Sequence, residues 1–547
     1  MGLRLREQTG ARRSEVFAGR GMAATSQPLA TQTAIALLRE GGSAVDAAIG
    51  ANAVQAVTEP TGAGLGGDLF AQVWSPDDRR LHGLNASGGA PQAAGRSWFE
   101  SGNHSQVPDI GGLSVTVPGA VDGWFELHER FGRLPMRRIL QHAVDYARDG
   151  FPVSEVIADE WAAEGRRLGE QPGFAETFLP AGRAPRKGER FRNPGLARTL
   201  DSLANDGRQA FYQGPAARAM AEAVQAAGGL LAEQDLAGHV SEWVDPVSVS
   251  YKGKRVWQLP PNGQGLAVLQ MLQLLEPWDL SRHGFGSPEH IHLLVEAKKL
   301  AFADRAHYYA DPAASEVPVE ALLSRQYANE RRTQIDESRA AMDVAAGEPS
   351  LDRGDTVYLT TADADGMMVS LIQSNFVGMG SGVVPRGLGF SLQNRAAGFS
   401  LQPGHANVIA PGKRPFHTII PGFVTRDDEP WIAFGVMGGA MQPQGQVQVL
   451  VNLLEFGMNL QAAGDAPRFC HEGGATPDGR AAAGDGGVLH LEPGFDPETV
   501  AALGERGHQV REGTGAFGGY QAIAFNPVDH IWRGASESRK DGQAAGY

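Results

Sequence analysis

The hydrophobic pattern near the N-terminus predicts two consecutive helices over residues 27–58. Apolar side chains recur at helical spacing through QPLATQTAIALLRE, and this run ends at Gly41-Gly42, where a glycine readily takes the left-handed conformation that closes a helix. Ser43 is placed to cap the second helix, AVDAAIGANAVQAV, whose small side chains suit close packing. A glycine-dense loop at 61–70 and two strands, FAQVWS and RLHGLNAS, are expected to follow.

The rest of the chain changes character at about residue 355. Residues 120–240 and the segment around 286–310 have helical patterns, whereas TVYLTTADADGMMVSLIQS indicates a strand, a turn and a strand. A further helix is expected at about 442–456, and the C-terminal GYQAIAFNPVDHIWRGAS predicts another hairpin. Because strand-rich segments have helices on either side, we expect layered sheets covered by helices.

Composition and charge narrow the classes of protein. The 547 residues allow several hydrophobic layers or more than one domain. The net charge of −14, without a long basic run, disfavours nucleic acid as a partner. Cys470 is the single cysteine, which excludes an intrachain disulfide and a thiolate cluster. The 15 histidines form no HExxH or similar ligand spacing, so neither a metal site nor a cofactor is expected.

The longest apolar runs are too short to span a bilayer, so no membrane partner is expected. The N-terminal segment MGLRLREQTGARRSEVF carries positive charge without a following apolar region, which is not the pattern of a secretory signal. A cytoplasmic location is therefore expected.

Thr356 is the first candidate for chemistry. It begins a predicted strand directly after Gly354-Asp355, at the end of a polar, Gly- and Pro-containing segment (335–355) that predicts an exposed linker. A threonine hydroxyl needs a base to act as a nucleophile. Cleavage before Thr356 would supply one, because the new α-amino group has a pKa of about 7.7–8.0. The simpler interpretation is an ordinary strand start.

Other segments offer weaker signals. Gly438-Gly439 stands between an apolar strand and a helix, where two N–H groups suit a developing oxyanion, although a plain strand-to-helix turn has the same pattern. GLGGD (64–68) lacks the Lys-Ser/Thr of a phosphate loop and follows a helix, which favours a packed glycine turn. His417 fits a structural histidine, with a substrate contact as the alternative, and Cys470 fits a small buried side chain.

Taken together, these segments resemble the gamma-glutamyltransferase family of N-terminal-nucleophile hydrolases, from about residue 20 to Tyr547. The resemblance rests on eight segments in the same order: GMAATSQPLATQTAIALLREGGSAVDAAIGANAVQAVTEPTGAGLGGDLF, HLLVEAKKLAFADRAHYYADP, GDTVYLTTADADG, GMGSGVV, KRPFHTIIP, GVMGGAMQPQGQVQVL, APRF and GASESRKDGQAAGY. No one of them would suffice, but their common order is specific.

The resemblance implies an α+β fold, a four-layer αββα sandwich. It also implies self-cleavage between Asp355 and Thr356, which gives a large fragment (1–355) and a small fragment (356–547). The two fragments are expected to associate as one intertwined catalytic unit. A dimer of such pairs is an open alternative. Thr356 matches the nucleophile of the family, Gly438 and Gly439 match its oxyanion hole, and Ser374 replaces a threonine that supports the nucleophile.

Departures from the family pattern concern the substrate. Ser87 stands where members that act on glutathione have an arginine for the glutamyl carboxylate, Gly398 replaces the acid that meets the amine, and His417-Thr418 replaces a Ser-Ser pair. Arg395 is a candidate for a relocated cation, because arginine binds carboxylates strongly and geometrically. Substrate contacts are therefore expected from these five residues: Asn375, Arg395, His417, Thr418 and Ser87.

Three functional hypotheses follow. The first is a self-processing gamma-glutamyl transferase or hydrolase that uses Thr356 and small-molecule amides. The second is an amidohydrolase or acylase with the same machinery, acting on a small amide that carries a carboxylate but no α-amino group, of oxamate or glutaryl type. The third is an unprocessed protein that keeps the fold as a binding scaffold without catalysis.

Overall fold

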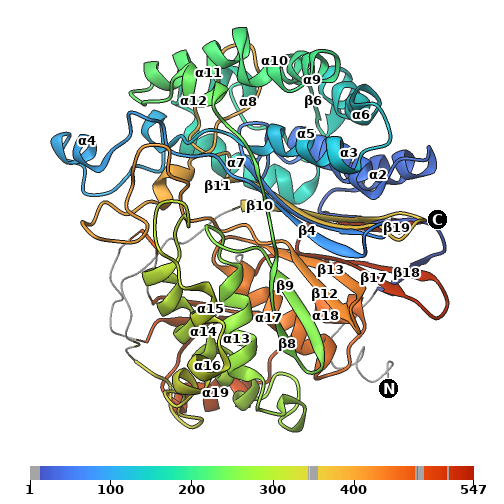
Figure 1. Cartoon of the computed structure of the whole chain (residues 1–547), viewed down its shortest axis with the longest axis vertical. Helices are drawn as coiled ribbons and strands as arrows, with labels where there is room; N and C mark the ends of the chain where they lie inside the picture. The colour runs from blue at the N-terminus through green and yellow to red at the C-terminus, as the bar shows by residue number, and fades with distance from the viewer. Residues whose placement is uncertain (1–12, 343, 345–354, 475–476, 479–485, 514–516) are drawn as a thin grey trace.

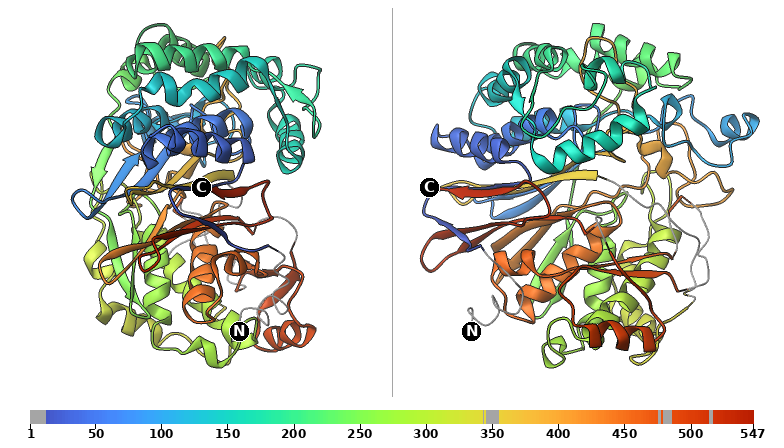
Figure 2. Two further views of the ribbon diagram at one scale, coloured as in Figure 1. Left: turned by 90° about the vertical axis from the view of Figure 1, so that its right-hand side faces the viewer. Right: turned by 180° about the vertical axis from the view of Figure 1, so that it is seen from behind.

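Two seven-stranded antiparallel sheets, stacked face to face, form the centre of the molecule, with helices on both outer faces (Figures 1 and 2). The computed structural model describes residues 13–342, 344, 355–474, 477–478, 486–513 and 517–547. Most of the predicted linker at 335–355 therefore lies outside the described residues. The expectation of an α+β protein with four αββα layers is confirmed.

The first sheet contains the strand that carries Thr356. In spatial order it consists of β19 (Gln543–Gly546), β2 (Met22–Thr25), β10 (Asp355–Ala362), β11 (Met368–Phe376), β3 (Asp68–Ser75), β4 (Arg80–Ala86) and β7 (Glu242–Val244). Strands from before and after residue 355 are neighbours in this sheet, since β10 pairs with β2 and β11 pairs with β3. The two parts of the chain are thus joined edge to edge inside one sheet.

The second sheet carries the glycine pair at the end of one of its central strands. In order it consists of β1 (Val16–Ala18), β18 (Ile531–Ser536), β17 (Gly519–Asn526), β13 (Glu429–Met437), β12 (Gly422–Arg426), β9 (Lys254–Gln258) and β8 (Val247–Tyr251). Smaller sheets are formed by β14 (Phe469–Glu472), β15 (Val488–Leu491) and β16 (Gln509–Glu512), and by β5 (Phe151–Pro152) with β6 (Arg190–Phe191).

Helices from the first half of the chain cover the outer face of the first sheet (Figure 1). This layer contains α2 (Pro28–Arg39), α3 (Ala44–Thr58), α5 (Ala120–Phe131), α6 (Met136–Asp149), α7 (Glu155–Leu168), α8 (Phe174–Phe178), α9 (Pro194–Asp206), α10 (Gln209–Tyr212), α11 (Gly214–Ala226) and α12 (Glu233–Ala237). Helix α4 (Arg96–Ser101) and the short helix η1 (Gly112–Ser114) lie beside it.

The outer face of the second sheet packs against a separate apolar core (Figure 1). Its helices are α13 (Gly265–Leu275), α14 (Pro288–Tyr308), α15 (Val319–Leu322), α16 (Arg325–Arg332), α17 (Met441–Leu454), α18 (Leu460–Asp465) and α19 (Pro497–Glu505). The short helix η2 (Leu280–Arg282) adds Leu280 to this core, whereas η3 (Arg395–Gly398) packs in another cluster. Among the described helices, none has the continuous hydrophobic length that a bilayer crossing requires.

The two predicted N-terminal helices form as their sequence indicates. Gly41 follows α2 with φ +91°, and Ser43 forms a capping box with Asp46 at the start of α3. Every residue of α3 is buried, and a Cβ on Gly50 would lie 2.3 Å from the Leu37 side chain of α2. The small residues of α3 therefore permit the close approach that the pattern predicted.

Candidate active site at the end of beta10

A β-bulge at Thr356 shapes the centre of the candidate site. Asp355 of β10 pairs with Phe376 of β11 and Val357 pairs with Gln373, so Thr356 stands opposite both Ser374 and Asn375. Bulges of this kind bend a strand and redirect side chains. Phe376 has φ +84°, which is unusual for a side chain of its size, and it marks the same irregularity. The predicted strand start at Thr356 thus coincides with a distorted end of the central β10–β11 pair.

The Thr356 hydroxyl is buried between two polar side chains. Its Oγ1 lies 3.5 Å from Ser374 Oγ and 3.5 Å from Gln442 Nε2, and the residue is 4% exposed. Ser374 Oγ accepts a hydrogen bond from the Phe376 N–H at 2.8 Å, which fixes its position. Thr356 and Ser374 therefore lie next to each other, as expected. A shift of a few tenths of an ångström would bring both contacts of Thr356 Oγ1 to ordinary hydrogen-bond length.

Gln442 is a site residue that the sequence did not reveal. Its Oε1 accepts from the Ile420 N–H at 3.1 Å, so its Nε2 is turned toward Thr356. Gln442 lies in the first turn of α17, directly after Gly438-Gly439. The same helix start thus places an amide side chain beside Thr356 and follows closely on the glycine pair.

Gly438 and Gly439 both have left-handed backbone conformations, with φ +112° and +54°. Their carbonyls accept from the Met441 and Gln442 N–H groups, which orients them into helix α17. Gln264 Nε2 donates to the carbonyls of both Gly439 and Thr418, and Arg305 holds the Gln264 side chain. This buried network holds the Gly438-Gly439 turn in place through the Gly439 carbonyl. Such a fixed turn suits a preorganised oxyanion hole.

A matched pair of glutamines tests the role of Gln442. The Gln442→Ala variant is expected to lower kcat about fivefold with little change in KM, because one neutral hydrogen-bond donor beside Thr356 is worth about 1 kcal/mol. Gln444 lies on the same helix, is equally buried and contacts His471 instead of Thr356. The Gln444→Ala variant serves as the control, and equal losses of kcat in both would contradict the assigned role.

Arg395 and Thr418 meet in a second part of the site. Arg395 Nη1 donates to Thr418 Oγ1 at 2.9 Å, and its guanidinium lies 4.2 Å from the centre of the Phe376 ring. The side chain is completely buried, and its Nε and Nη2 have no hydrogen-bond acceptor. Burial lowers the pKa of Arg395 to about 9, so it is charged at neutral pH. Two unpaired N–H groups on a buried cation offer a bidentate site for a carboxylate.

His417 is held by a buried carboxylate that the sequence interpretation overlooked. His417 Nε2 lies 3.0 Å from Asp68 Oδ2, and both residues are fully buried. The Ile419 N–H points to His417 Nδ1 at 3.4 Å, which assigns the ring proton to Nε2. Burial, with the charge of Arg395, lowers the pKa of His417 well below its usual range. This burial and the contact with Asp68 favour the structural interpretation of His417, which lies next to Thr418 in the sequence.

Ser87 and Asn375 are occupied mainly by the protein itself. Ser87 Oγ donates to Asn85 Oδ1 at 2.7 Å and accepts from Asn262 Nδ2 at 3.2 Å. Asn375 Nδ2 donates to the Ala63 carbonyl, while its Oδ1 is buried without a donor. Direct substrate binding by Ser87 and Asn375 stays a prediction, and the Ser87 hydroxyl has little hydrogen-bonding capacity left for it.

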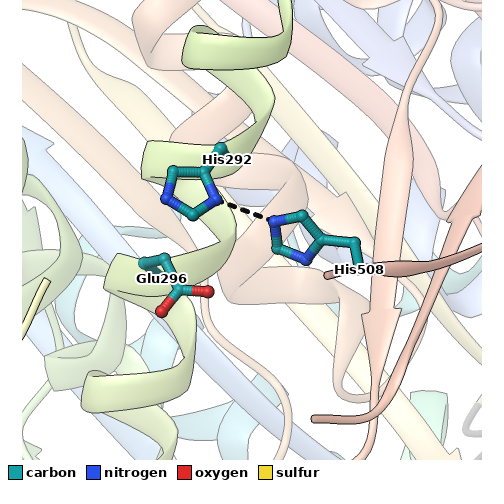
Figure 3. A group of neighbouring side chains, drawn as sticks. All are labelled: His292, Glu296 and His508. Carbon is teal, nitrogen blue, oxygen red and sulfur yellow. Dashed lines mark hydrogen bonds between the residues drawn. The ribbon is translucent and has the colours of Figure 1, made fainter. Parts of the chain in front are cut away.

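One cluster has the composition of a metal site, although the sequence spacing did not suggest one. His292 and Glu296 lie one turn apart on α14 and meet His508, all three buried, as Figure 3 shows. The His292 and His508 rings share a hydrogen bond of 2.8 Å, and Glu296 accepts from Lys299 and the Ala341 N–H. These partners, and the Lys299 ammonium beside the carboxylate, favour a structural link between α14 and the C-terminal part of the chain.

The fold and the site define the class of protein. Residues 30–547 match the family model for gamma-glutamyltranspeptidase, and the chain belongs to this family of N-terminal-nucleophile hydrolases. It is similar to a solved cephalosporin acylase from Bacillus halodurans, with 43% identity, a TM-score of 0.90 and coverage of 98% of this chain and 97% of that one.

Curated relatives of similar length carry more than one activity in their names. An oxamate amidohydrolase proenzyme from Klebsiella pneumoniae is 37% identical over 96% of this chain and 98% of its own length. A glutathione hydrolase-like YwrD proenzyme from Bacillus subtilis is 35% identical over 97% of this chain and 99% of its own length. The family is therefore clear, whereas the acyl group that is transferred differs among relatives.

Proposed function

We propose that the protein is a self-processing amide hydrolase that uses Thr356 as an N-terminal nucleophile on amides of short acyl groups bearing a carboxylate. The observation that carries this proposal is the position of the Thr356 hydroxyl, between Ser374 and Gln442 at a β-bulge, in a chain of this family. Cleavage of the peptide bond between Asp355 and Thr356 releases the Thr356 amine, and the two fragments stay joined through their paired strands.

The chemistry is acyl transfer in two steps. Thr356 Oγ1 attacks the amide carbonyl carbon while the free α-amine takes the hydroxyl proton. The N–H groups of Gly438 and Gly439 stabilise the oxyanion, the amine product leaves with a proton, and an acyl-threonine ester remains. Water then attacks the ester and restores Thr356, or an amino acceptor takes the acyl group in a transfer reaction.

The choice of acyl group follows from Arg395 and Asp68. The free Nε and Nη2 of Arg395 suit a substrate carboxylate. The Asp68 carboxylate already accepts from the N–H groups of Gly88 and Gly119, from Gln393 Nε2 and from His417. Because this acid is saturated, it is poorly placed to meet a substrate ammonium, which favours oxamate- or glutaryl-type acyl groups over the α-amino acid head of a gamma-glutamyl group.

A second candidate, gamma-glutamyl hydrolysis or transfer, is favoured by the similarity to the glutathione hydrolase-like protein. A substrate panel separates the two candidates. The processed enzyme is expected to hydrolyse oxamate and glutaryl anilide with kcat/KM at least about tenfold above that for gamma-glutamyl anilide, since an unpaired ammonium in a buried site costs more than 1.4 kcal/mol. Efficient turnover of gamma-glutamyl anilide that is insensitive to Arg395→Ala would contradict this account of the pocket.

A further inference from the structure

Asp68 is a buried carboxylate that joins the loops around the Arg395 pocket. It begins β3, and its Oδ1 accepts from Gly88 N and Gly119 N at 3.1 Å and from Gln393 Nε2 at 3.0 Å. Its Oδ2 has the single contact with His417 Nε2. Gln393 lies two residues before Arg395, and His417 directly precedes Thr418 in the sequence. Asp68 therefore controls both the position and the electrostatics of the groups that would hold an acyl carboxylate.

The charges around Asp68 come from three elements. Arg395 on η3 is the cation whose field favours the ionised carboxylate, and His417 on the neighbouring loop is neutral. Tyr212 on α10 also lies within the field of Asp68, but its hydroxyl donates to the Pro118 carbonyl and its pKa is raised well above 10 by burial. With Asp68 ionised, the empty pocket thus holds one positive and one negative charge.

A substrate carboxylate adds a second negative charge to this buried pocket. Two carboxylates that share one cation in a low-dielectric site repel each other, and such pairs respond by binding a proton. We propose that the Asp68–His417 pair takes up one proton from solvent when a carboxylate-bearing acyl group enters the pocket. The added proton binds Asp68 Oδ2 and is donated to His417 Nε2, whose own proton moves to Nδ1 and replaces the 3.4 Å contact with the Ile419 N–H. The filled pocket then again carries one positive and one negative charge. This inference rests on the proposed function of the site.

The sign of the pH dependence follows from this linkage. Burial raises the pKa of Asp68 to about 7, while the charge of Arg395 and the hydrogen bonds from Gln393, Gly88 and Gly119 act in the opposite direction. Below that pH the Asp68–His417 pair already holds the extra proton, so a carboxylate binds without further proton uptake. Above it, each pH unit weakens carboxylate binding about tenfold, as expected for one linked proton. Arg395 stays charged across this range because its pKa is about 9.

Inhibition by glutarate tests the inference without an unknown ligand. The competitive inhibition constant of glutarate is measured on the processed enzyme from pH 6 to 8.5, with the best amide from the substrate panel as reporter. The wild-type constant is expected to be flat below neutrality and to rise about tenfold per pH unit above it. The Asp68→Asn variant, which mimics the protonated state, is expected to bind glutarate about tenfold more tightly at pH 8 and without a pH slope.

Asp363 provides the matched control. It is also a buried aspartate with a pKa raised by burial, but it lies in the β10–β11 turn and accepts from Ala44 N and Met367 N. The Asp363→Asn variant should keep the wild-type slope. The inference would be overturned if the wild-type inhibition constant of glutarate did not change with pH while turnover stayed intact. It would also be overturned if Asp68→Asn bound glutarate more weakly at every pH. Either result would leave the proposed function standing. A wild-type protein that is not cleaved into two fragments and does not hydrolyse any amide would instead overturn the proposed function.

Discussion

The Thr356→Ala variant is expected to remain a single full-length chain and to lose amide hydrolysis by about 10⁴-fold or more, the scale seen when a covalent nucleophile is removed. The reason is that one residue supplies both the hydroxyl that attacks and, after cleavage, the amine that takes its proton. A denaturing gel and a rate measurement on the same preparation check both parts. Wild-type protein should give two bands, which together account for the full mass.

Two controls separate this result from a folding defect. The Thr356→Ser variant keeps a hydroxyl and an α-amine and should still be cleaved, with a slower but measurable rate. The Thr356→Ala variant should still unfold in one cooperative thermal transition, which shows that the uncleaved chain is folded. Full activity in a preparation that shows one uncleaved wild-type band would contradict the mechanism and point to another nucleophile, whereas an inactive single band would favour the non-catalytic scaffold.

Removing the buried cation is expected to have the second largest effect. The Arg395→Ala variant should raise KM for a carboxylate-bearing amide about 100-fold, because a desolvated bidentate contact between arginine and carboxylate is worth about 3 kcal/mol. Arg395→Lys should recover only part of this loss, since an ammonium cannot reproduce the fork of two N–H donors. Steady-state kinetics with oxamate and glutaryl anilide provide the measurement.

A neutral substrate distinguishes binding from packing. Arg395 also bonds to Thr418 and stacks on Phe376, so its removal disturbs the pocket as well as its charge. Hydrolysis of an anilide with an uncharged acyl group of similar size should therefore fall much less than hydrolysis of its acidic counterpart. An equal loss for both substrates would show that Arg395 supports the fold of the site and does not select the carboxylate.

The elements of the fold were largely predictable because their signals are local. The cap at Ser43, the stop at Gly41 and the hairpin from Thr356 to Ser374 depend on residues within a few positions of one another. The helix predicted at 442–456 appears as α17 (Met441–Leu454). The four-layer arrangement came only through the family resemblance, and the order of strands within each sheet was not predicted, since pairs such as β10 with β2 join segments more than 300 residues apart.

The candidate site was predictable only in part, for the same reason. The motif around Thr356 and the glycine pair are visible as short segments. Asp68 was hidden in GLGGD, which was interpreted as a packed glycine turn, although an acid directly before a buried strand was an available signal. Gln442 and Gln264 gave no signal, because their roles depend on Ile420, Gly439 and Thr418, which approach only in the folded chain.

The most direct test of the central claim is the N-terminal sequence and intact mass of the small fragment from active wild-type protein, before and after brief incubation with a slowly hydrolysed glutaryl ester. The account predicts a chain that begins Thr-Val-Tyr-Leu and gains the mass of one glutaryl group on its first residue. Active protein whose chain is uncut before residue 356, or whose acyl group is found on another residue, would contradict it.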